Sequence, residues 1–531
     1  MRKRYIILAG IYVDERKPIL NSFLAPIVEE LRFFHETGIV WKPDGVENIT
    51  SKFVTTTCVV DSVARYEILN MRSFLGIFGC TFCYAKGQRL PTSNNRIYRV
   101  RNYRYRTDIE MRRHMRSAMI TREPKFGIEG ASILQSLPMF HLRKSMVVDA
   151  MHNADLGVAK QMFHLIFFSA ATLVWYHGSP AILSLIDERM KKIRTPSRIA
   201  RKPRSMNTYK TWKASEWRNW ILYYAVSCLT GIIGNEYLSL FCKLSEALHI
   251  LNGDSINREE MDRAKILIEQ FVAEYQTIFG CENMTYNVHI LRHLCDTVEN
   301  WGPIWCNSAF IYESYNRKIA EAVNSPTGRP LQIMNKYLLN DFMRCVIHDP
   351  TMAEEMRSQI ISILNYGRKA PFRIKFNLHE HENFEGLGTF VSRELTDCER
   401  RILNSIRLTC RGRINVFKKC VIKGNMYTCG SVEQDDTRES NKNIYTKENH
   451  FAEILSFVKF VNHEEQAING MFVTFYETVG NLGETRHIKV LNHSNQRGFV
   501  IEDDLKAPAI IMNLTNEATY GVRMTNVWET D

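Results

Sequence analysis

Two pairs of residues suited to binding a soft metal ion stand far apart in the chain. Cys80 and Cys83 form a CxxC motif, and His289 and His293 follow much later with four-residue spacing. Two thiolates so spaced can hold one ion from a tight turn, and histidines at i and i+4 project from the same face of a helix. Together they predict a tetrahedral Cys2His2 zinc (Zn2+) site. The alternative is a buried pair of thiols and two histidines on an ordinary helix.

Two carboxylates are also placed where chemistry is expected. Asp61 directly follows the apolar residues 53–60, and Glu313 stands in the aromatic-rich segment 310–317. An ionised carboxylate at the end of a buried strand loses hydration unless a cation or hydrogen bonds replace it. Asp61 is therefore either a metal ligand or the N-cap of a helix that begins at Ser62.

The composition favours an intracellular protein with a polyanionic partner. The 531 residues include 69 Lys and Arg against 57 Asp and Glu, a net charge of +12, and 45% of them are hydrophobic. Such an excess of positive charge favours nucleic acid as the partner. Thirteen scattered cysteines, an odd number, suit a reducing compartment better than a disulfide framework. The apolar run 165–176 is too short to span a bilayer, so we expect no membrane association.

The first part of the chain has the pattern of an α/β layer fold. Basic residues 1–4 followed by apolar residues 5–13 superficially resemble a signal peptide, but the short β-branched run is more typical of a strand. A helix is expected over 21–37, and a β-branched, nearly continuous apolar strand over 53–60. A second helix is expected over 62–74. Strand, helix, strand and helix in succession predict an α/β fold.

Later regions change in character. Residues 158–299 are dominated by helical patterns, with the clearest helices at 212–230, 236–251 and 258–278. Beyond about 373, strand-like runs at 415–429, 451–460 and 470–477 surround the polar loop 431–450 and predict a small β-rich domain. The expected domains are 1–157, a helical insertion over 158–299, 300–345 with Glu313, a linker or helix over 346–372, and the β-rich domain 373–531.

Arginines interleaved with aromatics form a candidate DNA-binding surface. The candidates lie within residues 99–116 and are Arg101, Arg104, Arg106, Arg112 and Arg113. Guanidinium groups would contact phosphates while the tyrosines stack on unpaired bases. The alternative is an ordinary solvated face. The basic segment 191–204 could serve as a nuclear-import signal or as a further phosphate contact.

The order of these motifs resembles the CACTA-type DDE transposases over about residues 1–345. Four strings carry the resemblance, in the family's order: Asp61-Ser-Val-Ala-Arg65, the CxxC of Cys80 and Cys83, Asp149-Ala-Met-His152 and Glu313-Ser-Tyr-Asn316. The layout is also similar to the Transib transposases and the vertebrate antigen-receptor recombinase, whose paired cysteines and histidines bind zinc.

That resemblance implies an RNase H-like core in which two Asp and one Glu hold two Mg2+ (or Mn2+) ions. One ion would activate the attacking oxygen and the other would stabilise the leaving oxygen. By motif, Asp61 would be the second acid and Glu313 the third. Asp149 and His152 match an accessory motif, for which a role in DNA-hairpin handling, in the structure of the insertion, or in packing alone stays open.

The resemblance places residues 5–13 at strand three of the RNase H-like sheet, so the core is expected to lack its first strands. The first catalytic Asp would then precede Met1, because Asp14 follows the strand in a turn. We therefore expect an N-terminally truncated transposase-like chain without useful nuclease activity.

Three functions remain open at this point. The full-length form would cleave and transfer strands of double-stranded DNA at transposon ends, as a nuclear protein and, by resemblance, a homodimer. The alternatives are a domesticated or decayed, catalytically inactive DNA-binding protein and a zinc-stabilised scaffold with no role on DNA.

Overall fold

The protein divides into two compact units, seen in a computed structural model. The structure describes residues 6–43, 47–91, 95–347, 349, 351–364, 384–432, 438–515 and 518–525. The smaller unit comprises Met1–Thr56, Ser132–Phe140 and Ala309–His381. The larger unit comprises Thr57–Ala131, His141–Ser308 and Glu382–Asp531. Each unit is described by itself below.

The smaller unit is built mainly from helices. Its elements are α1 (Leu20–Glu36), β1 (Ile39–Trp41), β2 (Ile49–Ser51), the 3-10 turn η2 (Ile133–Ser136), α12 (Phe310–Ala320), α13 (Arg329–Val346) and α14 (Glu354–Leu364). The helix expected over 21–37 is confirmed as α1. Strands β1 and β2 form an antiparallel hairpin in which Val40 is opposite Thr50.

The strand expected over residues 5–13 is wrong for the part that is described. Residues 6–13 have irregular backbone, and Tyr5 lies outside the described residues. The Leu8 N–H donates to the hydroxyl of Tyr337 at 3.2 Å, and the side chains of Ile7 and Val13 are exposed. A strand needs a neighbouring strand to satisfy its backbone groups, and none in the described parts of the chain pairs with this segment.

The strand expected over residues 53–60 is reduced to one paired residue. Cys58 forms an isolated parallel bridge with Met146, and its N–H donates to the carbonyl of Ser145 at 2.8 Å. Phe53 and Val54 are exposed, so the apolar run is not covered on both faces. The following helix, α2 (Ser62–Ile68), is shorter than expected. In the described part of residues 1–157 the strands form only two-stranded hairpins, and an RNase H-like core is not confirmed.

Helices dominate residues 158–299 of the larger unit, as predicted. Before them come α2, β3 (Gln88–Arg89), β4 (Arg96–Ile97) and α3 (Asp108–Thr121). The helices that follow are η3 (Met151–Ala159), α4 (Lys160–Phe168), α5 (Pro180–Lys192), η4 (Met206–Thr211), α6 (Ala214–Asn219), η5 (Trp220–Tyr224), α7 (Ala225–Leu229), α8 (Asn235–Leu251), α9 (Arg258–Phe279), η6 (Cys281–Asn283), α10 (Tyr286–Ile290), η7 (Leu291–His293), α11 (Leu294–Trp301) and η8 (Ile304–Asn307). Two of them, η3 and η5, are π-helices. None of the helices in the described ranges has the length and apolar character needed to cross a membrane.

The β-rich region expected near the end of the chain is present. Its elements are β5 (Phe384–Leu387), β6 (Val391–Arg393), α15 (Asp397–Ser405), β7 (Ile414–Phe417), β8 (Lys419–Ile422), β9 (Asn425–Thr428), η9 (Gly430–Val432), β10 (Asn443–Thr446), β11 (Phe451–Val461), β12 (Ala467–Asn481), β13 (Ile488–Ile501), η10 (Glu502–Asp504), β14 (Leu505–Asn513) and β15 (Thr519–Arg523). Residues 373–383, the expected start of this region, lie outside the described residues.

Six antiparallel strands of this region close into a barrel. Their order is β10-β14-β15-β13-β12-β11, and β10 pairs with β11 to complete the ring. Closure leaves no free edges among these six strands. Strands β7 and β6 extend from β11, and β5, β8 and β9 form a separate small sheet.

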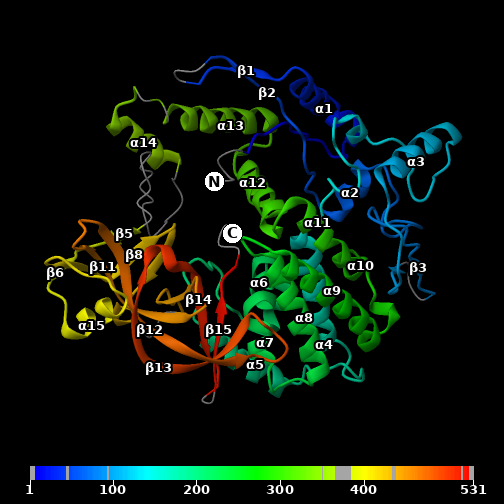
Figure 1. The fold of residues 1–531 in the computed structure, drawn as a ribbon. Coiled ribbons are helices and arrows are strands. Elements are labelled where there is room, and N and C mark those ends of the chain that lie inside the picture. Colours follow the sequence, from blue (N-terminus) through cyan, green and yellow to red (C-terminus); the bar gives the residue numbers. More distant parts are fainter. Residues whose placement is uncertain are drawn as a thin grey trace. The chain divides into compact units, whose positions relative to one another are not determined.

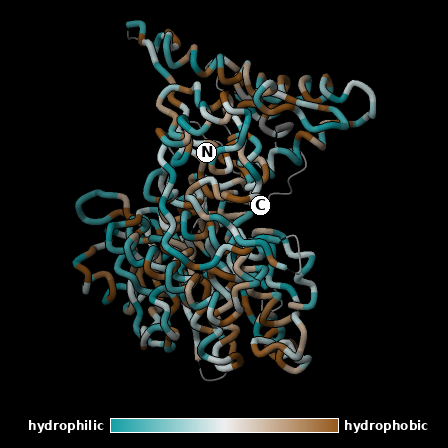
Figure 2. Tube along the Cα trace, turned by 90° about the vertical axis from the view of Figure 1, so that its right-hand side faces the viewer, coloured by the Kyte–Doolittle hydropathy of each residue, from teal (hydrophilic) through white to brown (hydrophobic). Residues whose placement is uncertain are grey.

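The barrel and the helices of the larger unit share one hydrophobic core, and they lie side by side in Figure 1. Trp217 and Trp220 of the helical region belong to the same buried cluster as Ile488, Ile510 and Val522 of the barrel. Along the chain of this unit, apolar and polar residues alternate in short stretches (Figure 2), as expected for amphipathic helices and strands that bury one side. The β-rich region is therefore packed as part of the larger unit.

Two histidines are buried together where α8 meets the start of β13. The rings of His249 and His487 have centroids 4.4 Å apart. The Nε2 atom of His487 lies 3.0 Å from the hydroxyl of Ser245, and that of His249 lies 3.2 Å from the carbonyl of Arg523. Burial lowers the pKa of His487 to about 3, and burial together with the His487 and Arg523 charges holds the pKa of His249 well below its usual value.

We expect this pair to make the protein acid-sensitive. In the unfolded chain the two histidines bind protons near pH 6.5, whereas in the folded chain they stay neutral. Their contribution to the unfolding free energy is therefore complete above pH 6.5 and is lost as the pH falls toward 3. The depressed pKa of His487 alone should lower the unfolding free energy of the protein by about 2 kcal/mol between pH 7 and pH 5. Urea unfolding at both pH values measures this loss.

The matched variants for that measurement are His487→Gln and His463→Gln. His463 is exposed, so its replacement should leave the pH dependence as in the unchanged protein. His487→Gln should make the unfolding free energy less dependent on pH. Equal pH dependence in both variants would show that the buried pair is not the cause.

Candidate metal centre

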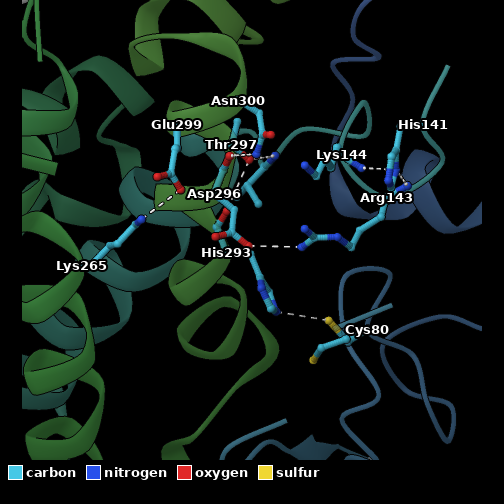
Figure 3. A network of polar contacts seen from close by, with 12 residues as sticks. Cys80, His141, Arg143, Lys144, Lys265, His293, Asp296, Thr297, Glu299 and Asn300 are labelled. Atoms are coloured by element: carbon cyan, nitrogen blue, oxygen red, sulfur yellow. Dashed lines mark hydrogen bonds and ion pairs between the residues drawn. The ribbon is translucent and has the colours of Figure 1, made fainter. Parts of the chain in front are cut away.

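The structure brings together the four residues predicted to bind zinc. Cys80 and Cys83 come from the turn between α2 and β3, while His289 lies in α10 and His293 in η7. All four are at least 96% buried, and one ligand atom from each lies within 4.8 Å of the others. Figure 3 shows His293 reaching toward Cys80 from its helical segment.

The distances fit a tetrahedral zinc ion. The Sγ atom of Cys83 lies 3.3 Å from Nε2 of His289, and Sγ of Cys80 lies 3.7 Å from Nε2 of His293. Zn–S bonds of about 2.3 Å and Zn–N bonds of about 2.0–2.1 Å place neighbouring ligand atoms roughly 3.3–3.8 Å apart. Two sulfurs and two nitrogens at these separations suit zinc better than magnesium, which prefers oxygen ligands.

The protonation states of Cys80 and His293 also favour metal binding, whereas that of Cys83 without a metal does not. Burial alone would raise the pKa of the Cys80 thiol, but hydrogen bonds from Cys83 and the two histidines outweigh it and hold this pKa well below its usual value. The pKa of Cys83 is raised, first by its hydrogen bond to Cys80 and then by burial. Burial lowers the pKa of His293 and so favours its neutral form. A thiolate and a neutral imidazole are the forms that bind metal ions.

Aromatic rings surround the two histidines. Tyr98 stacks on the His289 ring at 5.0 Å, and Phe82 stacks on the His293 ring at 5.1 Å. Tyr103 and Tyr105 contact the same two histidine rings edge-on, with centroids 5.6 and 5.3 Å apart. These tyrosines had been expected to stack on nucleic-acid bases. In the structure they pack against the ligand rings and help to orient them, with Tyr103 half-buried and Tyr105 exposed.

Arg106 holds the cysteine turn from inside and was predicted for a different role. It is 1% exposed, and its Nε donates to the carbonyls of Cys80 at 2.9 Å and Cys83 at 3.2 Å. Its Nη2 donates to the carbonyls of Phe78 at 3.0 Å and Phe126 at 2.9 Å. The proposed contact between Arg106 and DNA is wrong in this structure, because the guanidinium is buried against these backbone carbonyls.

The remaining candidate arginines lie in different environments. Arg104 pairs with Glu110 at 2.9 Å, and Arg112 pairs with Asp108 at 2.6 Å. Arg101 is exposed, and so is Arg113. The loop that carries Arg101 is anchored, since its carbonyl accepts a hydrogen bond from the guanidinium of Arg292 at 2.8 Å.

The helix that carries His293 is also fixed to the chain near residue 143. Asp296 pairs with Arg143 at 3.2 Å, as Figure 3 shows, and the Arg143 guanidinium lies 4.8 Å from the centre of the Tyr105 ring. The Val148 N–H donates to the hydroxyl of Thr297 at 3.1 Å. These contacts position η7 and α11, and therefore the His293 ring, relative to the cysteine turn.

The two proposed catalytic acids fall in different units. Asp61, in the larger unit, is the N-cap of α2, and its Oδ1 accepts a hydrogen bond from the Ala64 N–H at 2.7 Å. The helix-cap role weighed from the sequence is thus present. Glu313 lies in α12 of the smaller unit and is exposed.

The geometry of the described residues does not support a magnesium site. Within those residues, the four thiol and imidazole side chains are the one group of three or more His, Cys, Asp or Glu residues whose ligand atoms come close together.

The accessory motif forms a tight pair. His152 Nδ1 lies 2.5 Å from Oδ2 of Asp149, which is 2% exposed and also accepts from the His152 N–H at 3.2 Å. Asp149 lies two residues before the π-helix η3, and a hydrogen bond from Asn153 of η3 to the carbonyl of Asn287 at 2.7 Å ties this helix to α10. Of the roles left open for Asp149 and His152, this arrangement fits the one in the structure of the helical insertion.

Two residues support the centre in roles that the sequence did not predict. The first is Arg106, and the second is Gly157, where a Cβ would meet the side chain of Asn287 at 2.6 Å. The close approach of η3 to α10 therefore favours glycine at this position, because a larger residue would displace the Asn287 side chain. A lone glycine in a helical pattern carries no mark of such a contact.

No family model matches this sequence, and a search of curated proteins finds no match either.

Proposed function

We propose that this chain is a zinc-stabilised DNA-binding protein of the DDE transposase type. The observation that carries the proposal is the convergence of two thiols and two imidazoles, from segments far apart in the chain, at zinc-ligand distances. When bound, zinc would cross-link the cysteine turn to the α10–η7 segment. The order of the acidic, CxxC and paired-histidine motifs supports the transposase type by resemblance, and a nuclear location and a homodimer belong to the same proposal.

The DNA-binding surface would be the exposed arginines next to the metal centre. Arg99 and Arg101 lie on the anchored loop, and Arg113 and Arg116 are on the exposed face of α3. None of the four takes part in a salt bridge with another described residue. Because the loop is held in place by Arg292 and by a hydrogen bond from Val100 N–H to Gln276 at 2.8 Å, little ordering would be needed on binding.

DNA binding without strand cleavage is the form of the proposal we favour. The Asp61 carboxylate already accepts the hydrogen bond that caps α2, and the Glu313 side chain is exposed rather than enclosed. Incubation of supercoiled plasmid carrying candidate terminal repeats with the zinc-bound protein and Mg2+ tests this. We expect binding without nicking. Mg2+-dependent nicking that disappears in Asp61→Ala would contradict it and favour the transposase enzyme.

The DNA surface predicts a measurable salt dependence. Changing Arg101, Arg113 and Arg116 together to alanine should weaken duplex binding and flatten the plot of log affinity against log salt. Each lost phosphate contact should reduce the slope by about 0.9. Fluorescence anisotropy with a labelled DNA duplex from 50 to 200 mM salt measures both effects.

A triple variant with the same loss of charge provides the control. Arg400, Arg401 and Arg411 are exposed residues of the β-rich region. Their replacement with alanine should change the slope much less. Equal effects of the two triple variants would show that net charge alone, rather than this surface, governs binding.

A further inference from the structure

An open pocket lies beside the π-helix η3, apart from the metal ligands. Its volume is about 450 Å3, within the usual range for small-molecule sites. The lining residues come from η3, α4, η4 and α10 and are Leu156, Gly157, Lys160, Gln161, His164, Tyr209, Lys210 and Asn287. The pocket lies wholly within the larger unit.

The charge of the pocket is positive. Two lysines, Lys160 and Lys210, line it together with His164, and no carboxylate is among the lining residues. Neither lysine forms a salt bridge with another described residue. A site with two ammonium groups and no acid favours an anionic ligand.

The polar groups of the pocket are held in place by the surrounding fold. His164 Nδ1 lies 2.9 Å from the hydroxyl of Tyr209, which orients the imidazole. The amide of Gln161 donates to the carbonyl of Asn283 at 2.8 Å and accepts from Thr285 at 2.7 Å. π-Helical segments are rare and occur frequently at functional sites, which gives the location independent weight.

We propose that this pocket binds a phosphate ester of nucleotide size. Lys160 and Lys210 would neutralise the phosphate. The side-chain amides of Gln161 and Asn287 would exchange hydrogen bonds with the remainder of the ligand. The ligand is either a free mononucleotide or one nucleotide of a DNA strand, since both present the same phosphate chemistry. The site uses neither the zinc ligands nor the exposed arginines, so it goes beyond the function proposed above.

Isothermal titration of the zinc-bound protein with 5′-dAMP, with 2′-deoxyadenosine and with a single-stranded oligo(dA) tests the site. We expect 5′-dAMP to bind and 2′-deoxyadenosine, which lacks the phosphate, to bind at least tenfold more weakly. Lys160→Glu and Lys210→Glu should each weaken 5′-dAMP binding by about tenfold or more. Lys419→Glu, which changes an exposed lysine of β8, should leave 5′-dAMP binding unchanged.

Competition between oligo(dA) and 5′-dAMP would identify a DNA strand as the source of the phosphate, and absence of competition would identify the free nucleotide.

Failure of 5′-dAMP to bind would overturn the proposal, as would equal weakening by all three lysine variants. The exposed-arginine triple variant separates this site from the duplex-binding surface. It should bind 5′-dAMP normally while binding duplex DNA weakly. If duplex binding fails in the unchanged protein but 5′-dAMP binding is retained, the proposed function is wrong and the pocket stands.

Discussion

Replacing Cys83 with serine should abolish stoichiometric zinc binding and destabilise the larger unit by more than about 3 kcal/mol. The serine hydroxyl is a poor zinc ligand, and the remaining three side chains cannot complete the tetrahedron. The two parts of the chain that the ion would join, the cysteine turn and the α10–η7 segment, would then depend on weaker contacts alone. Metal content per chain and urea unfolding of the purified protein measure the two effects.

A second buried thiol provides the control for that experiment. Cys295, in α11, is 2% exposed and lies outside the four-ligand group. Cys295→Ser should retain one zinc per chain, although it exchanges a buried thiol for a hydroxyl in the same way. If Cys83→Ser keeps its zinc, or if both variants lose it equally, the ligand assignment is wrong.

Replacing Arg106 with alanine should have the second largest effect. The change removes hydrogen bonds from a charged donor to four backbone carbonyls, among them those of both cysteine ligands. Buried carbonyl acceptors left without donors destabilise the folded protein, and we expect the unfolding free energy to fall by more than about 3 kcal/mol. Zinc affinity should fall as well, because the cysteine turn loses the group that holds its conformation. Urea unfolding and competition for zinc with a chelator measure these changes.

Arg104 is the matched control, because it is two residues away and its side chain is 70% exposed. Arg104→Ala removes the same charge and an exposed ion pair with Glu110, which should cost less than about 1 kcal/mol. Arg106→Lys keeps the charge but not the planar array of donors, so zinc affinity should be only partly restored. Normal zinc affinity in Arg106→Ala would show that the guanidinium does not position the ligands.

The metal ligands and the helices were accessible from the sequence because both depend on local spacing. The CxxC spacing and the helical spacing of the paired histidines each place two side chains on the same side of a short segment. Sulfur and imidazole donors together indicate zinc. The helices α8 and α9 follow from apolar periodicity almost to the residue. The closed barrel was not predicted, because strand order depends on pairings between residues far apart in the chain.

The arginine and tyrosine segment shows where spacing alone misleads. The basic and aromatic residues within 99–116 are predicted to form one surface for nucleic acid. The structure exposes Arg101, packs Tyr103 and Tyr105 against the ligand histidines and buries Arg106 against the cysteine turn. The backbone of this segment pairs with the cysteine turn, where Cys83 is opposite Tyr105. That pairing decides which side chains are buried, and no pattern within the segment reveals it.

The early apolar runs failed as strands for a related reason. Residues 6–13 and 53–60 have the composition of buried strands, but a strand forms only where a neighbouring strand offers a ladder of backbone hydrogen bonds. In the second run Cys58 alone forms a β-bridge, with Met146. The carboxylate of Asp61 caps the helix that follows, where it accepts a hydrogen bond from the Ala64 N–H.

X-ray absorption at the zinc edge of the purified protein tests the central claim most directly. The account predicts one zinc per chain with two sulfurs at about 2.3 Å and two nitrogens at about 2.0–2.1 Å. Cys80→Ser, like Cys83→Ser, should lose stoichiometric zinc and with it the absorption signal of the two-sulfur site. A zinc surrounded by oxygen and nitrogen alone, or a protein that folds equally well and binds no zinc when zinc is supplied, would contradict it.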